Sequence, residues 1–308
     1  MSEISVIVCC YHPIYEKLIK TLISIENQKG VDFDIVVADD GSDQDFFAEV
    51  KTWAKEHHFT NIQYHKNEIN QGTVLNIRNA IPFCQSDYIK TISPGDFLFD
   101  EYSLAYYFEG FQKYNATIVT GKSVFFDEQY HILPTLYPKF EKSLTKKYQS
   151  RNFLAYDESF VGASLAFKKE YLSSGLEEFK GIVRLLEDKP LVNKCILENQ
   201  TIYVSPKILV WYEFGNGVTT SKTLSKSILN DLDHYYEYLS HTDNKYARRG
   251  ARIHFLNRHL SKIGKVLVLP FLAPGYFLYF LKAKLKKYPV HETDISKLHK
   301  ITMLRCEK

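Results

Sequence analysis

The chain has 308 residues, of which 45% are hydrophobic and 24% charged, an ordinary globular composition with room for one large α/β domain and an appendage. The first residues carry neither the basic nor the long apolar stretch of a secretory signal. The five cysteines are odd in number and form no CxxC pair, so we expect a cytosolic protein with reduced thiols and not a disulfide-stabilised secreted one.

The net charge of +3 hides an uneven distribution along the chain. Residues 245–291 contain eleven lysines and arginines and neither aspartate nor glutamate, which leaves the remainder of the chain net negative. Such a split predicts an acidic-to-neutral domain that is followed by a basic interaction tail.

The first 93 residues alternate strands with helices. We predict strands at residues 4–10, 33–39, 62–66 and 87–93. We predict helices at residues 13–29, 44–57 and 72–83. This alternation predicts a parallel sheet with right-handed crossovers, and ligands bind such sheets beyond the carboxyl ends of the strands. The candidate site loops are therefore residues 10–12, 39–42, 67–72 and 93–96.

The rest of the chain is less regular. Residues 127–158 are rich in Pro and Tyr and predict an irregular loop over the site, and residues 160–172 predict a strand that enters a helix. The chain after residue 222 is predicted to be helical, with breaks at Pro270, Pro274 and Gly275.

Several segments, taken together, resemble the GT-A-fold glycosyltransferases of family 2. They are SVIVCCYH, FDIVVADDGS, NQGTVLNIRNA and YIKTISPGDFLFD, then GIVRLLEDKPLVNKCI and the closing loop YEFGNGVTTS, in family order from residue 4 to about 221. The resemblance implies an α/β GT-A fold, with a mostly parallel sheet flanked by helices. Residues 1–222 would form the catalytic domain, whose nucleotide-sugar half covers about 1–100 and acceptor half about 101–222. Residues 223–308 would form a helical, basic and apolar extension.

The resemblance implies a donor pocket at the strand ends. By position, Tyr11 would lie against the nucleobase with the Cys10 backbone nearby, and Asp40 would accept a hydrogen bond from the N3–H of uracil or thymine. Asn70 and Arg78 would line the same pocket. In isolation, Asp40 is also typical of a turn and Arg78 of a solvated helix.

The loop at Pro94 matches the position of the family's metal-binding D-x-D loop, although only its last acid, Asp96, is present. The resemblance implies that Asp96 binds Mn²⁺ or Mg²⁺ together with the donor diphosphate, since phosphate oxygens and water can complete the shell. Gly95 would let the backbone approach the donor closely. A surface turn with a helix-capping Asp is the structural alternative.

The segment RLLEDKPL places Glu187 and Asp188 at a predicted helix start, where acids often serve only as partners of the helix dipole. The family places its catalytic base here. We expect Asp188 to take the proton of the acceptor hydroxyl in an inverting transfer and Glu187 to orient the site or the acceptor.

The segment KVLVLPFLAPGYFLYFLKAKLKKY is interrupted by prolines and too short for a typical membrane span. It predicts two short amphipathic pieces that lie on a membrane surface, with basic residues at their flanks. A buried hairpin that packs on the catalytic domain or forms a homo-oligomer is the alternative. No nucleic-acid motif accompanies these charges, so we expect no nucleic-acid partner.

Together these features and the resemblance predict an inverting glycosyltransferase that moves a sugar from a UDP- or dTDP-sugar to a saccharide acceptor. We expect this acceptor to be lipid-linked and the reaction to belong to bacterial surface polysaccharide synthesis. The expected location is cytoplasmic, at the inner face of the cell membrane. A nucleotidyltransferase, or a domain of this fold that only binds nucleotide or a partner enzyme, are the alternative functions.

Overall fold

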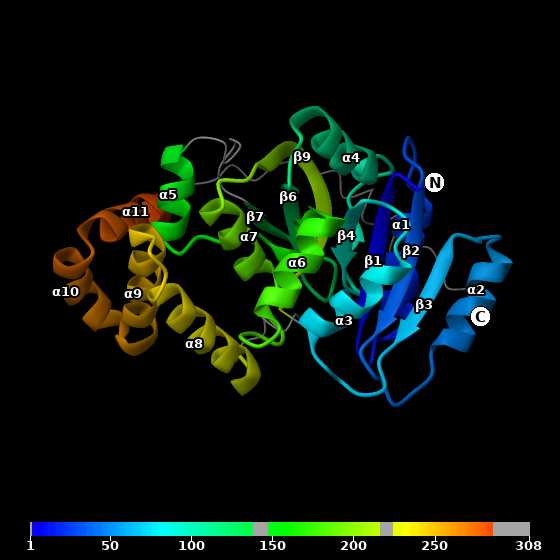
Figure 1. Cartoon of the computed structure of the whole chain (residues 1–308), viewed down its shortest axis with the longest axis horizontal. Helices are drawn as coiled ribbons and strands as arrows, with labels where there is room; N and C mark the ends of the chain where they lie inside the picture. The colour runs from blue at the N-terminus through cyan, green and yellow to red at the C-terminus, as the bar shows by residue number, and fades with distance from the viewer. Residues whose placement is uncertain (1, 138–146, 216–223, 286–308) are drawn as a thin grey trace.

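The computed structural model describes residues 2–137, 147–215 and 224–285. Their strands form one nine-stranded sheet, with β7 (Ile132–Tyr137) paired to β6 (Figure 1). The order of the other strands is β3 (Ile62–Lys66), β2 (Phe33–Asp39), β1 (Ile4–Cys10), β4 (Tyr88–Ile92), β8 (Ala166–Lys168), β6 (Ile118–Phe126), β9 (Ile202–Glu213) and β5 (Phe97–Leu98). Six strands run in one direction and β5, β7 and β8 run against them, so the predicted α/β class with a mostly parallel sheet is confirmed.

The first half of the sheet has the predicted alternation. Between its four parallel strands lie α1 (Tyr15–Glu26), α2 (Phe47–Glu56), α3 (Thr73–Ala80) and the short helix η1 (Ile81–Phe83). Strand β1 is buried over most of its length, and Leu18, Leu22 and Ile25 of α1 are fully buried, which is the helical spacing read from the sequence. This half places the carboxyl ends of β1, β2 and β4 at one edge of the sheet.

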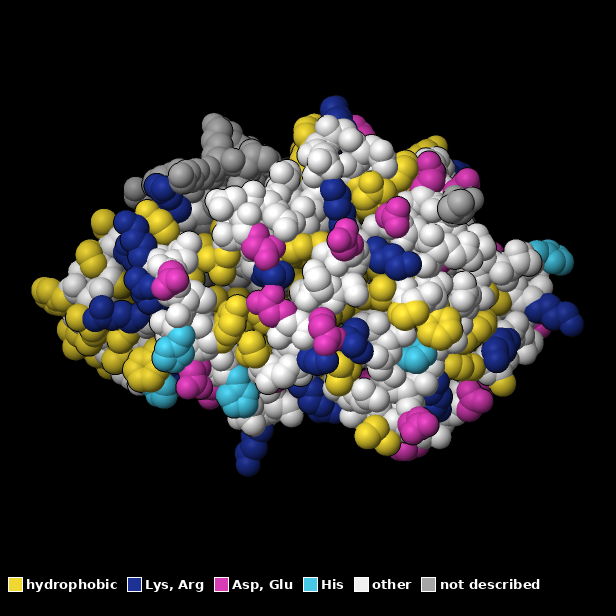
Figure 2. All heavy atoms as spheres, viewed as in Figure 1, with side chains coloured by type: hydrophobic (Ala, Val, Ile, Leu, Met, Phe, Trp, Pro, Cys, Tyr) yellow, Lys and Arg dark blue, Asp and Glu magenta, His cyan; other side chains and the backbone are white. Residues whose placement is uncertain are grey.

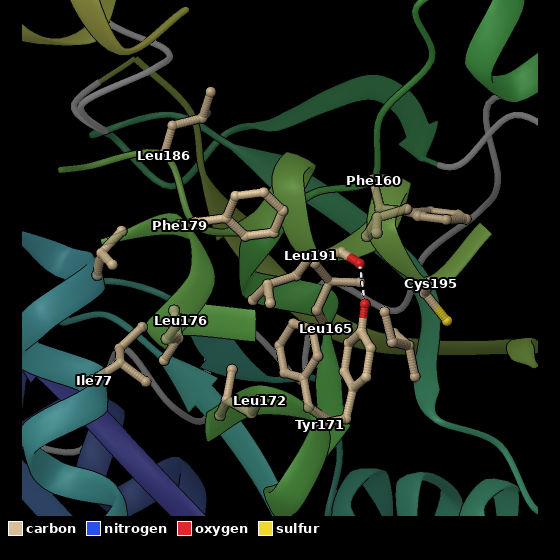
Figure 3. Close-up of a cluster of buried hydrophobic side chains, with 14 of the residues drawn as sticks. Ile77, Phe160, Leu165, Tyr171, Leu172, Leu176, Phe179, Leu186, Leu191 and Cys195 are labelled. Carbon is tan, nitrogen blue, oxygen red and sulfur yellow. Dashed lines mark hydrogen bonds between the residues drawn. The ribbon is translucent and has the colours of Figure 1, made fainter. Parts of the chain in front are cut away.

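The second half carries α4 (Ser103–Tyr114), the short helix η2 (Gly162–Ser164), α6 (Lys169–Phe179) and α7 (Asp188–Leu197). Helices α6 and α7 pack through a buried apolar cluster, in which the hydroxyl of Tyr171 donates to the carbonyl of Leu191 at 2.6 Å (Figure 3). This contact fixes α7, the helix whose start carries Glu187 and Asp188.

The expectation of an irregular segment at residues 127–158 is wrong in two places. Residues 132–137 form β7, which pairs with β6 through a turn in which the NH of Asp127 donates to the carbonyl of His131 at 3.0 Å. Pro134 is compatible with this strand because β7 pairs only at the border of the sheet, where a missing NH is tolerated. Residues 147–155 form helix α5 (Lys147–Ala155), and residues 138–146 lie outside the described part of the chain.

The described part of the chain after residue 223, up to residue 285, is helical, as predicted. It forms α8 (Lys226–Ser240), α9 (Lys245–His259), α10 (Lys262–Leu272) and α11 (Pro274–Leu285) at one end of the molecule (Figure 1). Pro274 separates α10 from α11, but Pro270 does not break α10. It lies in the last turn, where only the carbonyl of Val266 loses its helical partner. In the described residues, no helix is both long and apolar enough to cross a membrane.

The hydrophobic core runs across the predicted boundary at residue 222. Tyr235 and Leu239 of α8 and Ala247 of α9 belong to the same buried cluster as Ile7 of β1 and Leu191 of α7. Helix α8 is therefore packed into the sheet domain.

Candidate active site

Two of the predicted loops are joined at the carboxyl ends of β1 and β2. The backbone NH of Asp40 donates to the carbonyl of Cys10, and the NH of His12 donates to the hydroxyl of Ser42, both at 2.8 Å. The Ser42 hydroxyl donates in turn to Oδ1 of Asp39 at 2.5 Å. Asp39 therefore holds the DDGS turn against the end of β1 and leaves Asp40 at the site.

The carboxylate of Asp40 fastens the 67–72 loop to this edge. Its Oδ1 accepts from Nδ2 of Asn67 and from the NH of Gln71, both at 2.9 Å, and its Oδ2 accepts from the NH of Gly72 at 2.7 Å. Asp40 is buried. A carboxylate has about four acceptor positions. Three protein donors therefore leave room for one further hydrogen bond from a ligand.

The turn between β2 and this loop requires glycine at residue 41. Gly41 has a φ of +75°, and a Cβ atom there would lie 2.5 Å from the backbone carbonyl carbon of Ile69. We expect Gly41→Ala to lower the free energy of unfolding by at least about 1–2 kcal/mol, because the left-handed conformation alone costs a non-glycine residue that much. Urea unfolding followed by circular dichroism measures this loss.

Gly181 offers a matched control for this substitution. An added Cβ atom there has no neighbour within 4 Å, and its φ lies outside the left-handed region. Gly181→Ala should therefore change the free energy of unfolding by less than about 0.5 kcal/mol. Equal losses in the two variants would contradict the steric requirement at Gly41.

The other predicted donor-side residues have separate surroundings. Tyr11, just beyond β1, is 52% exposed. Asn70 accepts hydrogen bonds from Nη2 of Arg184 at both its backbone and its side-chain oxygen, the former at 3.0 Å. Arg78 of α3 donates from Nε to Oε2 of Glu177 of α6 at 2.5 Å. The structure thus ties Asn70 to the segment before α7 and pairs Arg78 with α6, and their contacts with nucleotide stay predictions.

The 93–96 loop ends on the buried carboxylate of Asp96. Thr21 of α1 holds this loop, since its Oγ1 accepts from the NH of Gly95 at 3.0 Å and donates to the carbonyl of Asp96 at 2.9 Å. Oδ1 of Asp96 accepts from the NH of Glu213 at 3.0 Å. The Glu213 side chain lies against Gly95 and pairs with Lys17 at 2.6 and 2.8 Å. A second carboxylate therefore stands beside Asp96.

A buried lysine accompanies Asp96. Lys90 of β4 is fully buried, and its Nζ donates to the carbonyls of Thr91 and Ala163, both at 2.5 Å. Burial lowers the pKa of Lys90 to about 7, although the charge of Asp96 opposes this shift. Burial likewise raises the pKa of Asp96 to about 7, against the hydrogen bond from Glu213 and the charge of Lys90. Two groups that titrate near neutral pH in one place are typical of a functional site.

The carboxylates at this loop suit a divalent cation that is shared with a ligand. Asp96 and Glu213 supply carboxylate oxygens, which Mg²⁺ and Mn²⁺ prefer. Lys17 already neutralises Glu213. In the described residues, no three His, Cys, Asp or Glu side chains gather closely enough to hold an ion. With Asp96 and Glu213 as its protein ligands, a cation here would need phosphate oxygens and water to complete its shell.

Glu187 and Asp188 stand at the start of α7, as the sequence predicts. Asp188 is the first residue of the helix, and both residues are half-buried. Oδ1 of Asp188 accepts from the NH of Lys189 at 2.7 Å, and its Oδ2 would lie 3.0 Å from a Cβ atom added at Gly162. The carboxylate of Asp188 thus points toward the η2 segment, where glycine leaves it space.

The thiol of Cys9 marks the place where the two predicted halves of the site meet. Cys9 is the penultimate residue of β1, and the charges of Glu187, Lys90 and Asp40 all act on it. Burial, and next the charge of Glu187, raise the pKa of Cys9 far above its ordinary value, so the thiol stays protonated. Asp40 and Glu187 therefore both lie near this end of β1.

Burial raises the pKa of both carboxyls at the start of α7, and the charge of Asp188 raises the pKa of Glu187 further. Adjacent carboxyls resist simultaneous ionisation in a low dielectric. Such a pair holds and releases a proton closer to neutral pH than an isolated carboxyl, which suits a general base.

The sequence alone did not predict a role for three polar residues around these groups: Lys90, Glu213 and Asp231. A lone lysine inside the apolar strand YIKTI was the available signal for Lys90, and an acid after ILVWY was the signal for Glu213. No sequence pattern indicates Asp231, because its partners are backbone NH groups of residues 184–186, which are distant in sequence.

Comparison with known families agrees with this geometry. The model of the family described as glycosyl transferase family 2 matches residues 5–173, more than half of the chain. The chain belongs to glycosyl transferase family 2. The predicted family and enzyme class are confirmed, and this family 2 protein is a glycosyltransferase. No curated protein matches its sequence.

Solved structures share the fold of this family 2 chain. TarS of S. aureus, residues 1–349 in complex with UDP-GlcNAc, superposes with a TM-score of 0.59 at 16% identity over 98% of this chain and 91% of that one. The complex of the same TarS fragment with UDP gives 0.57 at 16% identity, over 98% and 90%. A longer TarS structure gives 0.58 at 17% identity over 89% of this chain, which spans 46% of that protein.

Proposed function

We propose that this glycosyltransferase moves a sugar from a UDP- or dTDP-sugar to a saccharide acceptor with inversion at the anomeric carbon. The observation that carries the proposal is that Asp40 and the segment leading to Glu187 and Asp188 meet on one loop: Asp40 accepts from the NH of Gly72, and the carbonyl of Arg184 accepts from the NH of Val74. It gives a donor-side acceptor group and a candidate base at one edge of the sheet, where ligands of such sheets bind. The TarS structures, which share the fold and were solved with UDP and UDP-GlcNAc, support a uridine nucleotide.

In this proposal Asp188 is the general base. Its carboxylate takes the proton of the acceptor hydroxyl while that oxygen forms a bond to the anomeric carbon, and the bond from this carbon to the nucleoside diphosphate breaks. Glu187 orients the acceptor or the base.

The donor side uses the strand-end loops. Tyr11 stacks on the base, and Asp40 accepts the N3–H of uracil or thymine at its remaining acceptor position. Cys10 contributes backbone, and Asn70 and Arg78 border the pocket. Asp96, with Gly95 close by, would hold Mn²⁺ or Mg²⁺, and the ion would offset the charge that develops on the departing diphosphate.

We also propose that the acceptor is lipid-linked, in bacterial capsule, exopolysaccharide or cell-wall synthesis, and that α10 and α11 rest on the inner face of the membrane. One face of this pair packs on α9 through Leu269 and Ala273. The other face is solvent-exposed, at 74% for Ile263, 63% for Leu267 and 84% for Phe271. Figure 2 shows hydrophobic side chains gathered at this end of the molecule, with Lys and Arg beside them.

The arrangement favours a membrane surface over a buried hairpin. Exposed aliphatic and aromatic side chains next to a basic segment match an anionic interface. Not every aromatic side chain of α11 faces solvent, because Tyr276 and Phe277 pack against the cluster of Ile253.

We expect Leu267→Ser/Phe271→Ser to lower binding to phosphatidylglycerol vesicles at least about tenfold, because burial of each side chain contributes roughly 1.5–3 kcal/mol. Vesicle flotation measures the bound fraction, and high salt should weaken it for the unmodified protein. Ile14→Ser, which removes a side chain of 62% exposure near β1, is the matched control and should bind normally. The protein could instead bind no vesicles and form a concentration-dependent dimer that the double substitution abolishes. This outcome would show that the exposed face binds a second copy of the chain and not a membrane.

Nucleotide-sugar hydrolysis tests the donor assignment directly. The protein is incubated with UDP-, dTDP-, GDP- and CDP-sugars, with Mn²⁺ or with EDTA, and the released nucleotide is measured. Hydrolysis of the uridine or thymidine donors alone supports the proposal. Preferential use of GDP- or CDP-sugars would contradict the pocket built on Asp40, and nucleotide binding without turnover of any donor would favour a non-catalytic role.

A further inference from the structure

One carboxylate of the C-terminal helices is buried against the segment that leads to the predicted base. Asp231 of α8 is 5% exposed. Its Oδ2 accepts hydrogen bonds from three successive backbone NH groups, of Arg184 at 2.9 Å, Leu185 at 2.6 Å and Leu186 at 3.1 Å. Three donors on one oxygen atom fix the path of the chain immediately before Glu187.

The segment that Asp231 holds also touches the donor side. Nη2 of Arg184 donates to the carbonyl of Asn70, and the carbonyl of Arg184 accepts from the NH of Val74 at 3.1 Å. An added Cβ at Gly72 would lie 2.3 Å from the Arg184 side chain. Because Asp40 binds the NH of Gly72, residues 184–186 lie between α8 and the donor loop.

Helix α8 holds the other side of the predicted base as well. Lys189, which follows Asp188, forms an ion pair with Asp157 at 2.5 Å, and the hydroxyl of Tyr236 donates to the same carboxylate. The Tyr235 hydroxyl accepts from Nδ2 of Asn193 in α7 at 2.9 Å. Residues on both sides of Asp188 are thus tied to α8.

We infer that Asp231 is a positioning residue for the base of this transferase, acting through the backbone of residues 184–186 to place Glu187 and Asp188 at the end of β1. The inference rests on the proposed function of Asp188. It gives the helices beyond residue 222 a part in the transfer reaction. Without the carboxylate, three NH groups, of which that of Leu186 is buried, lose their acceptor, and the segment relaxes toward other paths.

The charge of Asp231 gives the inference an electrostatic signature. Burial, then the charge of Asp188 and that of Asp231, raise the pKa of Glu187. The other titratable groups that face the pair are Cys9 of β1, Tyr236 of α8 and Lys189. Removal of the Asp231 charge should therefore lower the pKa of Glu187, whose charge interacts with that of Asp188, and move the acid limb of the rate profile to lower pH.

The experiment compares Asp231→Ala, Asp231→Asn and the control Asp233→Asn. Asp233 lies on the same helix but is exposed and paired with Arg258. Hydrogen exchange followed by mass spectrometry should show faster exchange across residues 184–186 in Asp231→Ala and no change in the control. We expect kcat to fall about 100-fold in Asp231→Ala, as is typical when a reacting group is displaced by about 1 Å.

Asp231→Asn keeps an acceptor oxygen for the three NH groups, so it tests the loss of charge in a variant that should still fold. We expect a smaller loss of kcat than in Asp231→Ala, with an acid limb at lower pH than in the unmodified protein. Unchanged exchange at residues 184–186 in Asp231→Ala, or an acid limb of Asp231→Asn at the original pH, would overturn the inference. Full transfer by Asp188→Asn would instead remove the proposed base, while hydrogen exchange would still decide whether Asp231 fixes the segment.

Discussion

Asp188→Asn is expected to lower transfer by about 10²–10⁴-fold, the usual contribution of a general base. Asparagine keeps the size of the side chain and an oxygen that can accept from the NH of Lys189, but it cannot take a proton from the acceptor. The donor-side groups are untouched, so UDP should bind as in the unmodified protein. The loss should appear in kcat, because the interaction matters only as the acceptor oxygen attacks.

Steady-state kinetics together with calorimetry of UDP binding would separate the two effects. Glu187→Gln is the matched comparison, since it alters the neighbouring carboxyl, and we expect a milder loss if Glu187 orients the site. Full activity of Asp188→Asn with an inactive Glu187→Gln would reverse the roles. If both variants stay active, the start of α7 has no part in proton transfer.

The same pair determines the expected pH dependence. The pKa values of Glu187 and Asp188 are raised, mainly by burial, so protonation begins at a higher pH than for an isolated carboxyl. A base works only when deprotonated. Transfer should therefore decline as the pH falls through the pKa of the pair, and this acid limb should lie closer to neutral pH than a solvated Asp would place it.

Asp96→Ala is expected to abolish the metal dependence of donor binding and to weaken UDP-sugar binding at least about tenfold, since a charge-assisted contact to a bound ligand contributes roughly 1.5–3 kcal/mol. Without nucleotide, Mn²⁺ should bind weakly even to the unmodified protein, because Asp96 and the Lys17-paired Glu213 do not form a complete shell. Titration calorimetry of Mn²⁺ and of UDP, separately and together, measures the affinity for the metal and its effect on nucleotide binding.

Two further variants make this test specific. Asp96→Asn retains an oxygen that can accept from the NH of Glu213 and so isolates the loss of charge from the loss of that hydrogen bond. Asp87→Ala removes an exposed acid immediately before the first residue of β4, at the opposite end of that strand from Asp96. This variant should leave donor binding unchanged. Full UDP-sugar affinity of Asp96→Ala, or undiminished turnover in EDTA, would exclude a metal role for Asp96.

The sequence by itself determined the first half of the sheet and the residues at its edge. Strands and helices there follow from local periodicity, and the carboxyl ends of neighbouring parallel strands necessarily meet. The left-handed conformation of the glycine of ADDGS also follows from local physics, whereas the exclusion of a Cβ atom there comes from the backbone of Ile69 in the loop after β3. Proline content, in contrast, was a poor guide at residues 127–158, because Pro134 lies in a strand at the border of the sheet.

Only the tertiary structure decided which polar groups face one another. The partner of Arg78 is Glu177, the NH beside Asp96 comes from Glu213, and both contacts join residues roughly a hundred positions apart. Packing also decided that α8 belongs to the same core as β1. Asp231 acquires its position from that packing, because its three donors are backbone NH groups, which every residue other than proline carries and which leave no mark in a sequence.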